Sequence, residues 1–166
     1  MVIAVMGVSG CGKSTLAQAL ARELGWAFQE GDDLHPAAHI AKMRAGIPLD
    51  DADRGPWLDA IAAWITAIEQ RGERGVVSCS ALKRRYRDRL RRACPGLRWV
   101  YLELPRAELA LRMARRHHFM PPVLLDDQLR TLEPPGPDEG ALTVPGDQPC
   151  DVLVATVRRW LGQSTR

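Results

Sequence analysis

Long hydrophobic runs are absent from the sequence. The longest apolar stretches, such as Val2–Met6 and residues 152–155, fall far short of the roughly 20 residues that a membrane-spanning helix needs. Only Met1 precedes the first of them, which leaves no room for the basic segment and cleavage site of a secretory leader. We therefore expect a cytoplasmic protein with no membrane partner.

Cysteine is scarce as well. The four cysteines stand at positions 11, 79, 94 and 150, and this wide spacing fits neither a zinc site nor the dense disulfide framework of a small secreted domain. We interpret them as reduced thiols.

Internal repeats, low-complexity tracts and linker-like segments are also missing. The chain has 166 residues, of which 46% are hydrophobic and 26% charged, as in a typical globular domain with one main core. We therefore expect residues 1–166 to form a single domain.

Short apolar runs alternate with amphipathic helical patterns along the chain. Strands are expected at residues 2–6, 26–30, 76–79, 99–104 and 141–144, and helices at residues 13–24, 56–71, 83–92, 106–116, 123–132 and 151–161. Pro56 suits the first turn of the second helix, and the polar residues 46–55 before it are expected to be a loop. Because the strands are almost continuously apolar, the pattern predicts an α/β fold with a parallel sheet covered by helices on both faces.

One glycine-rich motif lies between the first strand and the first helix. It matches G-x-x-x-x-G-K-[ST], the P-loop, and comprises Gly7, Val8, Ser9, Gly10, Cys11, Gly12, Lys13 and Ser14, with Thr15 following. Backbone N–H groups and the helix N-terminus bind phosphate oxygens in such a loop, Lys13 would reach the β and γ phosphates, and Ser14 would bind Mg²⁺. The motif predicts a nucleoside triphosphate site rather than a chance glycine-rich turn. It does not identify the molecule that would accept the phosphoryl group.

The acceptor class follows from what accompanies this loop. The sequence has no N-K-x-D motif for guanine and no L-S-G-G-Q motif, so the pattern favours a small-molecule kinase over a GTPase or a transporter ATPase. Such a kinase needs a carboxylate beside the γ phosphate. Glu30 and Asp32 would point the same way if the second strand continues, whereas Asp33 would point away and is better suited to a helix N-cap.

Taken together, these motifs resemble the gluconate kinases, relatives of shikimate kinase among P-loop proteins of the nucleoside-monophosphate-kinase type. The resemblance runs nearly end to end, through M-G-V-S-G-C-G-K-S at 6–14, G-D-x-L-H-P at 31–36, D-x-D-R-x-P-W-L at 51–58, C-S-A-L-K-x-x-Y-R-D at 79–88 and A-R-x-x-H-F at 114–119. It implies transfer of a phosphoryl group from ATP to the 6-hydroxyl of D-gluconate, with Mg²⁺, in a protein that is commonly a homodimer.

The same resemblance implies a set of acceptor-binding residues. D-Gluconate carries a carboxylate and five hydroxyls, so its site needs a cation and several hydrogen-bonding groups. An acceptor-binding insertion is expected at about residues 37–57. The implied substrate-binding residues are Asp32, His35, Arg54, Ser80, Ala81, Leu82, Lys83 and Arg87. The alternative for His35 is that it stabilises its own turn, and Trp57 is expected to pack under Arg54.

Other residues are implied on the nucleotide side. Arg115 matches the catalytic arginine of a lid at about residues 115–122, which would close over the phosphates and join Lys13 and Asp32 as catalytic groups. Asp147, Gln148 and Pro149 resemble the loop that borders the base. Where relatives often have Asp-x-Asp, this chain has Glu30-x-Asp32, so Mg²⁺ is expected to rest on Ser14, phosphates and water.

Residues 83–92 hold seven of the 23 basic residues. A nucleic-acid site would interleave aromatic side chains with these charges, and only Tyr86 does so. We expect no nucleic-acid partner, and most of these arginines to form a solvated surface. Two rival functions remain at this stage, a kinase for another small hydroxy acid or polyol, and a non-catalytic P-loop regulator that binds nucleotide and a polyanion.

Overall fold

The computed structural model describes residues 1–115 and 123–163, and its centre is a five-stranded sheet. The strands are β1 (Val2–Met6), β2 (Ala27–Glu30), β3 (Gly75–Ser78), β4 (Arg98–Glu103) and β5 (Leu142–Pro145). They pair in parallel in the order β2-β3-β1-β4-β5, with Ile3 opposite Val76 on one side and Arg98 on the other. The predicted parallel sheet is confirmed, with each strand within about one residue of its expected bounds.

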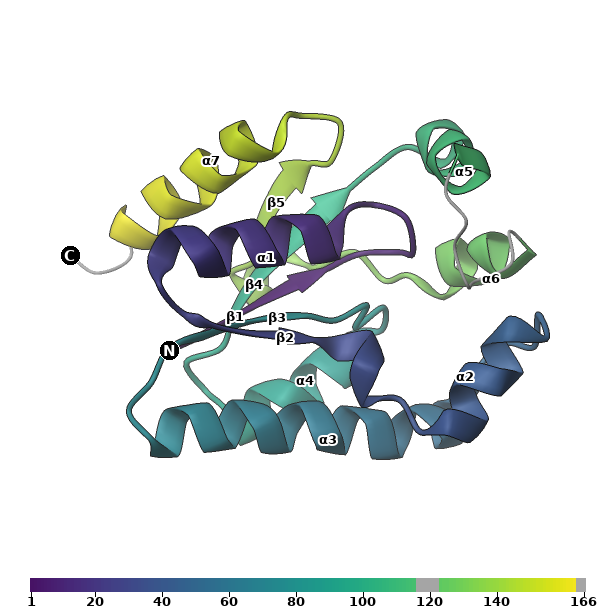
Figure 1. The fold of residues 1–166 in the computed structure, drawn as a ribbon, viewed down its shortest axis with the longest axis horizontal. Coiled ribbons are helices and arrows are strands. Elements are labelled where there is room, and N and C mark those ends of the chain that lie inside the picture. The colour runs from purple at the N-terminus through teal and green to yellow at the C-terminus, as the bar shows by residue number, and fades with distance from the viewer. Residues whose placement is uncertain (116–122, 164–166) are drawn as a thin grey trace.

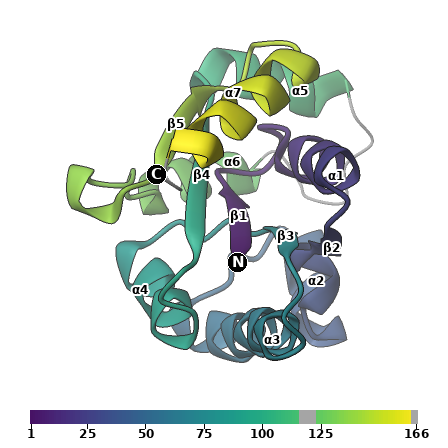
Figure 2. The same cartoon turned by 90° about the vertical axis from the view of Figure 1, so that its left-hand side faces the viewer.

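Helices cover both faces of this sheet. α1 (Lys13–Leu24) and α7 (Cys150–Gln163) lie on one face, and α3 (Asp51–Gln70) and α4 (Arg84–Ala93) lie on the other (Figures 1 and 2). Alternate residues of β1 serve the two layers, because successive side chains of a strand point to opposite faces. Ile3 and Val5 pack with the α1 side, whereas Val2, Ala4 and Met6 pack with the α3 side.

The remaining helices gather at the end of the molecule away from the two termini (Figure 1). They are α2 (Ala37–Arg44), α5 (Arg106–Arg115) and α6 (Val123–Thr131), and two short 3₁₀ helices, η1 (Gly31–Leu34) and η2 (Pro137–Glu139), complete the fold. The predicted lid lies, apart from Arg115, outside the described residues. No helix in residues 1–115 and 123–163 combines the length and apolar character needed to cross a membrane.

The start of α3 corrects the expected loop at residues 46–55. The Asp50 side chain accepts from the Asp53 N–H, and Asp53 accepts from the Asp50 N–H, at 2.7 and 3.0 Å. This capping box begins the helix at Asp51 and leaves Pro56 inside it rather than in its first turn. The polar residues of this segment are thus a helix N-terminus, and only residues 45–50 form the loop.

The condition under which Glu30 and Asp32 would point the same way, a second strand that continues to Asp32, is not met. The strand ends at Glu30, whose carboxylate accepts from the Asp32 N–H and from the Ser78 hydroxyl, and η1 begins at Gly31. A Cβ atom at Gly31 would lie 2.0 Å from the Ser78 carbonyl oxygen, so glycine is required where the chain turns across β3. Strand alternation therefore gives no basis for the orientations of Asp32 and Asp33.

Acidic groups surround the basic helix α4. Arg84 pairs with Asp138, Arg85 with Asp51 and Arg89 with Asp59. These contacts distribute the positive charge over ion pairs, which favours the interpretation as a solvated surface.

All four cysteines are free thiols, and burial raises the pKa of Cys11 and Cys79.

Candidate active site

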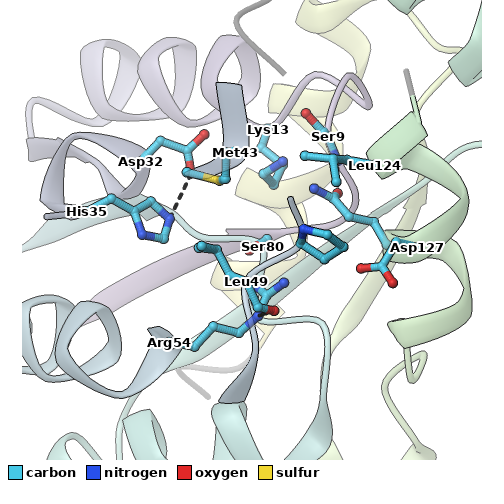
Figure 3. A pocket seen from close by; sticks show the side chains of 12 residues that line it. Ser9, Lys13, Asp32, His35, Met43, Leu49, Arg54, Ser80, Leu124 and Asp127 are labelled. Atoms are coloured by element: carbon cyan, nitrogen blue, oxygen red, sulfur yellow. Dashed lines mark hydrogen bonds and ion pairs between the residues drawn. The ribbon is translucent and has the colours of Figure 1, made fainter. Parts of the chain in front are cut away.

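A central pocket opens where the parallel strands end. Three loops reach it, the P-loop after β1, η1 after β2 and the segment that follows β3, because the carboxyl ends of parallel strands meet at one edge of the sheet. Its lining residues, all drawn as sticks in Figure 3, are Ser9, Lys13, Asp32, His35, Met43, Pro48, Leu49, Arg54, Ser80, Leu124, Asp127 and Gln128.

The P-loop has the conformation that its glycines allow. Gly7, Gly10 and Gly12 have φ angles of 147°, 81° and 103°, and a Cβ atom on Gly7 would lie 2.8 Å from the Leu102 carbonyl oxygen. The Lys13 ammonium donates to the Val8 carbonyl at 3.0 Å, which folds the lysine back over the loop. The loop thus presents backbone N–H groups, the start of α1 and one ammonium to the same space.

A second space, the side cavity, lies on the other side of the P-loop. It is lined by Cys11, Gly12, Thr15, Leu16, Leu102, Arg112, Gly146, Gln148, Cys150 and Leu153. Arg112 fastens its two walls together, donating to the Gly146 carbonyl at 2.9 Å and to the Cys11 carbonyl at 3.4 Å. Of the three residues expected beside the base, Gln148 lines this cavity. Its sequence neighbours Asp147 and Pro149 are not among the lining residues.

Asp32 and His35 form the wall made by η1. The His35 ring stacks on Trp57 with centroids 4.5 Å apart, and the Trp57 indole donates to the Gly31 carbonyl at 2.8 Å. Trp57 therefore supports His35, and the aromatic ring found beside the Arg54 guanidinium is that of Tyr86. Asp32 lines the pocket and Asp33 is exposed, so the structure separates these neighbours even though strand alternation does not.

His35 is held in its neutral form. Burial, and to a smaller extent the positive charges of Arg54 and His39, lower its pKa to about 4. Its Nδ1 atom is buried without a hydrogen-bond partner among the described residues, and its Nε2 atom lies 4.0 Å from an Asp32 carboxylate oxygen. A neutral imidazole has one donor and one acceptor, which suits a hydroxyl group better than an anion.

The cations of the pocket come from α3 and from the start of α4. Arg54 is 7% exposed, its Nε donates to the Leu49 carbonyl at 3.4 Å, and its guanidinium lies 5.7 Å from the centre of the Tyr86 ring. Figure 3 shows it across the pocket from Ser9 and Lys13. Lys83 lies in an adjoining groove that shares Arg54 and Leu49 with the central pocket, and it binds Asp51 at 3.1 Å.

Arg87 does not reach the pocket, contrary to the sequence-based assignment. Its side chain is fully buried and makes a two-pronged ion pair with Glu139, at 2.6 and 2.8 Å. It also donates to the carbonyls of Ala81 and Leu82, at 3.1 and 3.3 Å. Arg87 therefore supports the loop after β3 from behind.

That loop contributes less to the pocket than expected. Ser80 lines it, but the side chains of Ala81 and Leu82 are completely buried in the two halves of the core. Ala81 has a φ angle of 39°, a left-handed conformation that is unusual for a residue with a Cβ atom. Arg115 is exposed at the end of α5, and the segment that follows it lies outside the described residues.

Sequence reasoning missed the contribution of α6 to the site. Leu124, Asp127 and Gln128 all line the central pocket, and Gln128 accepts a hydrogen bond from the Ser9 N–H. The helical pattern at residues 123–132 was visible, but no motif showed that one face of this helix meets the P-loop.

Comparison with known proteins agrees with this geometry. The profile of a family described as an AAA domain matches residues 3–119. The gluconokinase of Gluconobacter oxydans is 48% identical over 158 residues, which cover 95% of this chain and 89% of that protein. A gluconokinase structure from Sinorhizobium meliloti has 44% identity and a TM-score of 0.85, covering 99% of this chain and 97% of that one. A structure of a sugar kinase from Janibacter has 43% identity and a TM-score of 0.93, covering 97% and 94%. The chain therefore belongs to the gluconokinase family, as its sequence motifs predict.

Proposed function

We propose that this protein transfers the γ-phosphoryl group of ATP to the 6-hydroxyl of D-gluconate, producing 6-phospho-D-gluconate and ADP. One observation carries the proposal, namely that a single pocket joins the P-loop lysine Lys13, the carboxylate Asp32 and the buried cation Arg54. The names of the relatives, gluconokinases at 48% and 44% identity, supply the substrate.

The two spaces around the P-loop set the direction of the nucleotide. Cys11, Gly12 and Thr15 face the side cavity, which takes the adenosine, with Arg112 and Gln148 on its walls. Ser9 and Lys13 face the central pocket, where the terminal phosphate lies. The phosphate chain therefore runs over the start of α1 toward the acceptor, with the N–H groups of residues 10–15 around it.

Gluconate fits the central pocket with its carboxylate toward Arg54 and its 6-hydroxyl toward Asp32. Arg54 lies across the pocket from Lys13, so the anionic end is kept away from the ATP phosphates (Figure 3). His35, neutral at physiological pH, and Ser80 offer hydrogen bonds to intermediate hydroxyls. Lys83, in the adjoining groove, adds positive charge near the carboxylate.

In the transfer step the 6-hydroxyl oxygen forms a bond to the γ phosphorus while the bond from that phosphorus to the β–γ bridging oxygen breaks. Asp32 accepts the hydroxyl proton, and ADP leaves with the bridging oxygen and its electron pair. Lys13 stabilises the charge on the β and γ phosphates, and Arg115, at the end of α5, adds a second cation.

Magnesium fits the oxygen donors of the site. Ser14 lies half-buried in the first turn of α1 beside Lys13, and its hydroxyl would hold the ion together with phosphate oxygens and water. The described residues contain no cluster of three or more His, Cys, Asp or Glu side chains that could hold a metal by themselves. Glu30 is occupied with Ser78 and the Asp32 N–H, so its role is to shape η1. When bound, the ion would neutralise phosphate charge.

The test compares two neighbouring aspartates. We expect Asp32→Asn to lower kcat for gluconate phosphorylation by roughly 10² or more, because the amide cannot accept the proton. Its melting temperature and ADP affinity should stay close to those of the wild type. Asp33→Asn is the matched control and should keep kcat within about threefold, since its side chain is exposed and outside the pocket.

Coupled detection of ADP, with gluconate and a panel of other aldonic acids and polyols, measures both rates and specificity. An inactive Asp33→Asn together with an active Asp32→Asn would overturn the catalytic assignment. If the wild type phosphorylates another acceptor faster than gluconate, that acceptor is the better assignment of the substrate. ATP turnover that no acceptor stimulates would refute the kinase function.

A further inference from the structure

A buried hydrogen bond links α6 to the P-loop. The Ser9 N–H donates to the Gln128 side-chain oxygen at 2.7 Å, across 119 positions of sequence. Ser9 is 6% exposed and Gln128 is 8% exposed. A backbone N–H donor needs an acceptor, which determines that the amide oxygen and not the nitrogen of Gln128 faces the loop.

Ser9 stands in the part of the P-loop that faces the central pocket. It lines the central pocket, whereas Cys11, Gly12 and Thr15 line the side cavity. The N–H that Gln128 holds therefore belongs to the part of the loop nearest the phosphate that is transferred and the hydroxyl that receives it. Gln128 lines the same pocket as Lys13 and Asp32.

The helix that carries Gln128 also contacts the acceptor side of the pocket. Leu124, one turn earlier, packs with Met43 of α2 and with Leu49. After the helix, the Glu133 N–H donates to the Leu82 carbonyl at 2.8 Å, and its carboxylate accepts from the Arg84 N–H at 2.7 Å. α6 is thus attached both to the phosphate-binding loop and to the elements that surround the acceptor.

We propose that Gln128 is a positioning residue for phosphoryl transfer. By holding the Ser9 N–H, it fixes the part of the P-loop that faces the central pocket relative to α6, and so sets the terminal phosphate in line with an acceptor held between α2, α3 and α6. A displacement of about 1 Å between reacting groups can lower a rate by roughly 10², so one such link has a large effect on kcat. The proposal rests on the proposed function, because it assumes that the central pocket is where phosphoryl transfer takes place.

The first test removes the hydrogen bond at nearly constant volume. In Gln128→Met the Ser9 N–H loses its partner, and we expect kcat for gluconate phosphorylation to fall roughly tenfold or more. The KM for gluconate and the dissociation constant for ADP should stay within about threefold of the wild type. Gln18→Met, the same change at an exposed position of α1, is the matched control and should leave all three quantities unchanged.

The second test asks whether Gln128 lies beside the terminal phosphate, and it needs no acceptor. Gln128→Glu keeps an oxygen that can accept from Ser9 but adds a negative charge. Binding of ADP and of a non-hydrolysable ATP analogue is measured by calorimetry. We expect the analogue to lose roughly tenfold in affinity relative to ADP, because its additional phosphate meets the new carboxylate.

The outcomes separate the two proposals. A Gln128→Met variant with kcat within threefold of the wild type, or one that loses ADP affinity and thermal stability in proportion to kcat, would reduce Gln128 to a packing residue. If Gln128→Met does not fold, the Gln128→Glu variant decides. A ratio of analogue affinity to ADP affinity that equals the wild-type ratio would then overturn the proposal. A wild-type protein that does not phosphorylate gluconate would refute the proposed function, while the nucleotide measurements would still decide the position of Gln128.

Discussion

Replacement of Arg87 distinguishes a residue that binds substrate from one that supports the fold. Its guanidinium makes four hydrogen bonds, two to Glu139 and two to the carbonyls of Ala81 and Leu82. Arg87→Met would leave the Glu139 carboxylate, whose side chain is 1% exposed, without its counter-ion. The Gly136 N–H, 3.0 Å away, would be the hydrogen bond that remains to it in the described structure.

The expected loss is about 3–5 kcal/mol in the free energy of unfolding, the usual range when one partner of a buried ion pair is removed. For a domain of this length each kcal/mol lowers Tm by about 2–4 °C, so a fall of roughly 10 °C is expected. The double variant Arg87→Met/Glu139→Met should recover much of the loss, because neither charge then stays buried alone. Arg87→Lys should recover little, since an ammonium cannot reproduce the two-pronged geometry.

Urea unfolding followed by circular dichroism measures these stabilities, and gluconate kinetics at a temperature where each variant is folded complete the assay. The pH dependence provides an internal check. Hydrogen bonding to Arg87 lowers the pKa of Glu139 from its usual 4.5. The ion pair therefore contributes fully to the stability of the wild type above pH 4.5, and this contribution is lost as the pH falls through the lowered pKa. An Arg87→Met variant of normal stability with a strongly raised gluconate KM would refute this reasoning and restore Arg87 to the substrate site.

Two further predictions concern the pocket itself. Arg54→Ala should raise the KM for gluconate by the equivalent of about 1.5–3 kcal/mol with little change in the KM for ATP, because a charge-assisted hydrogen bond to the carboxylate is lost. Steady-state kinetics with each substrate varied in turn measures both constants. A raised KM for ATP with an unchanged KM for gluconate would place the residue in the nucleotide site instead. Burial lowers the pKa of His35 to about 4, so this side chain binds a proton near pH 6.5 in the unfolded chain but stays neutral there in the folded protein. As the pH falls from 8 to 5, this residue alone should therefore lower the free energy of unfolding by about 2 kcal/mol. Urea titrations at both pH values should show a smaller decrease for His35→Gln than for the wild type, and equal decreases would contradict the buried, neutral assignment.

The local features of the fold follow from sequence because their causes are local. The P-loop needs glycines at φ angles that other residues avoid, and it needs an apolar strand before it and an amphipathic helix after it, all within residues 2–24. The parallel sheet follows from strands that are apolar on both faces. The capping box at Asp50 and Asp53 was equally local, so the early start of α3 could have been predicted from D-D-A-D, had that signal outweighed the polarity of the segment.

Only the tertiary structure decided which charged and polar side chains reach the site. Arg87 stands in a motif that carries other site residues, and nothing in its neighbourhood shows that Glu139, 52 positions later, returns to bury it. Gln128 meets Ser9 across 119 positions through the packing of α6, an arrangement with no sequence motif of its own. Glycine conformation and apolar periodicity act over a few residues and can therefore be interpreted from the chain. Ion pairs and hydrogen bonds between distant segments depend on how helices are packed around the sheet, so their partners are known only when the fold is complete.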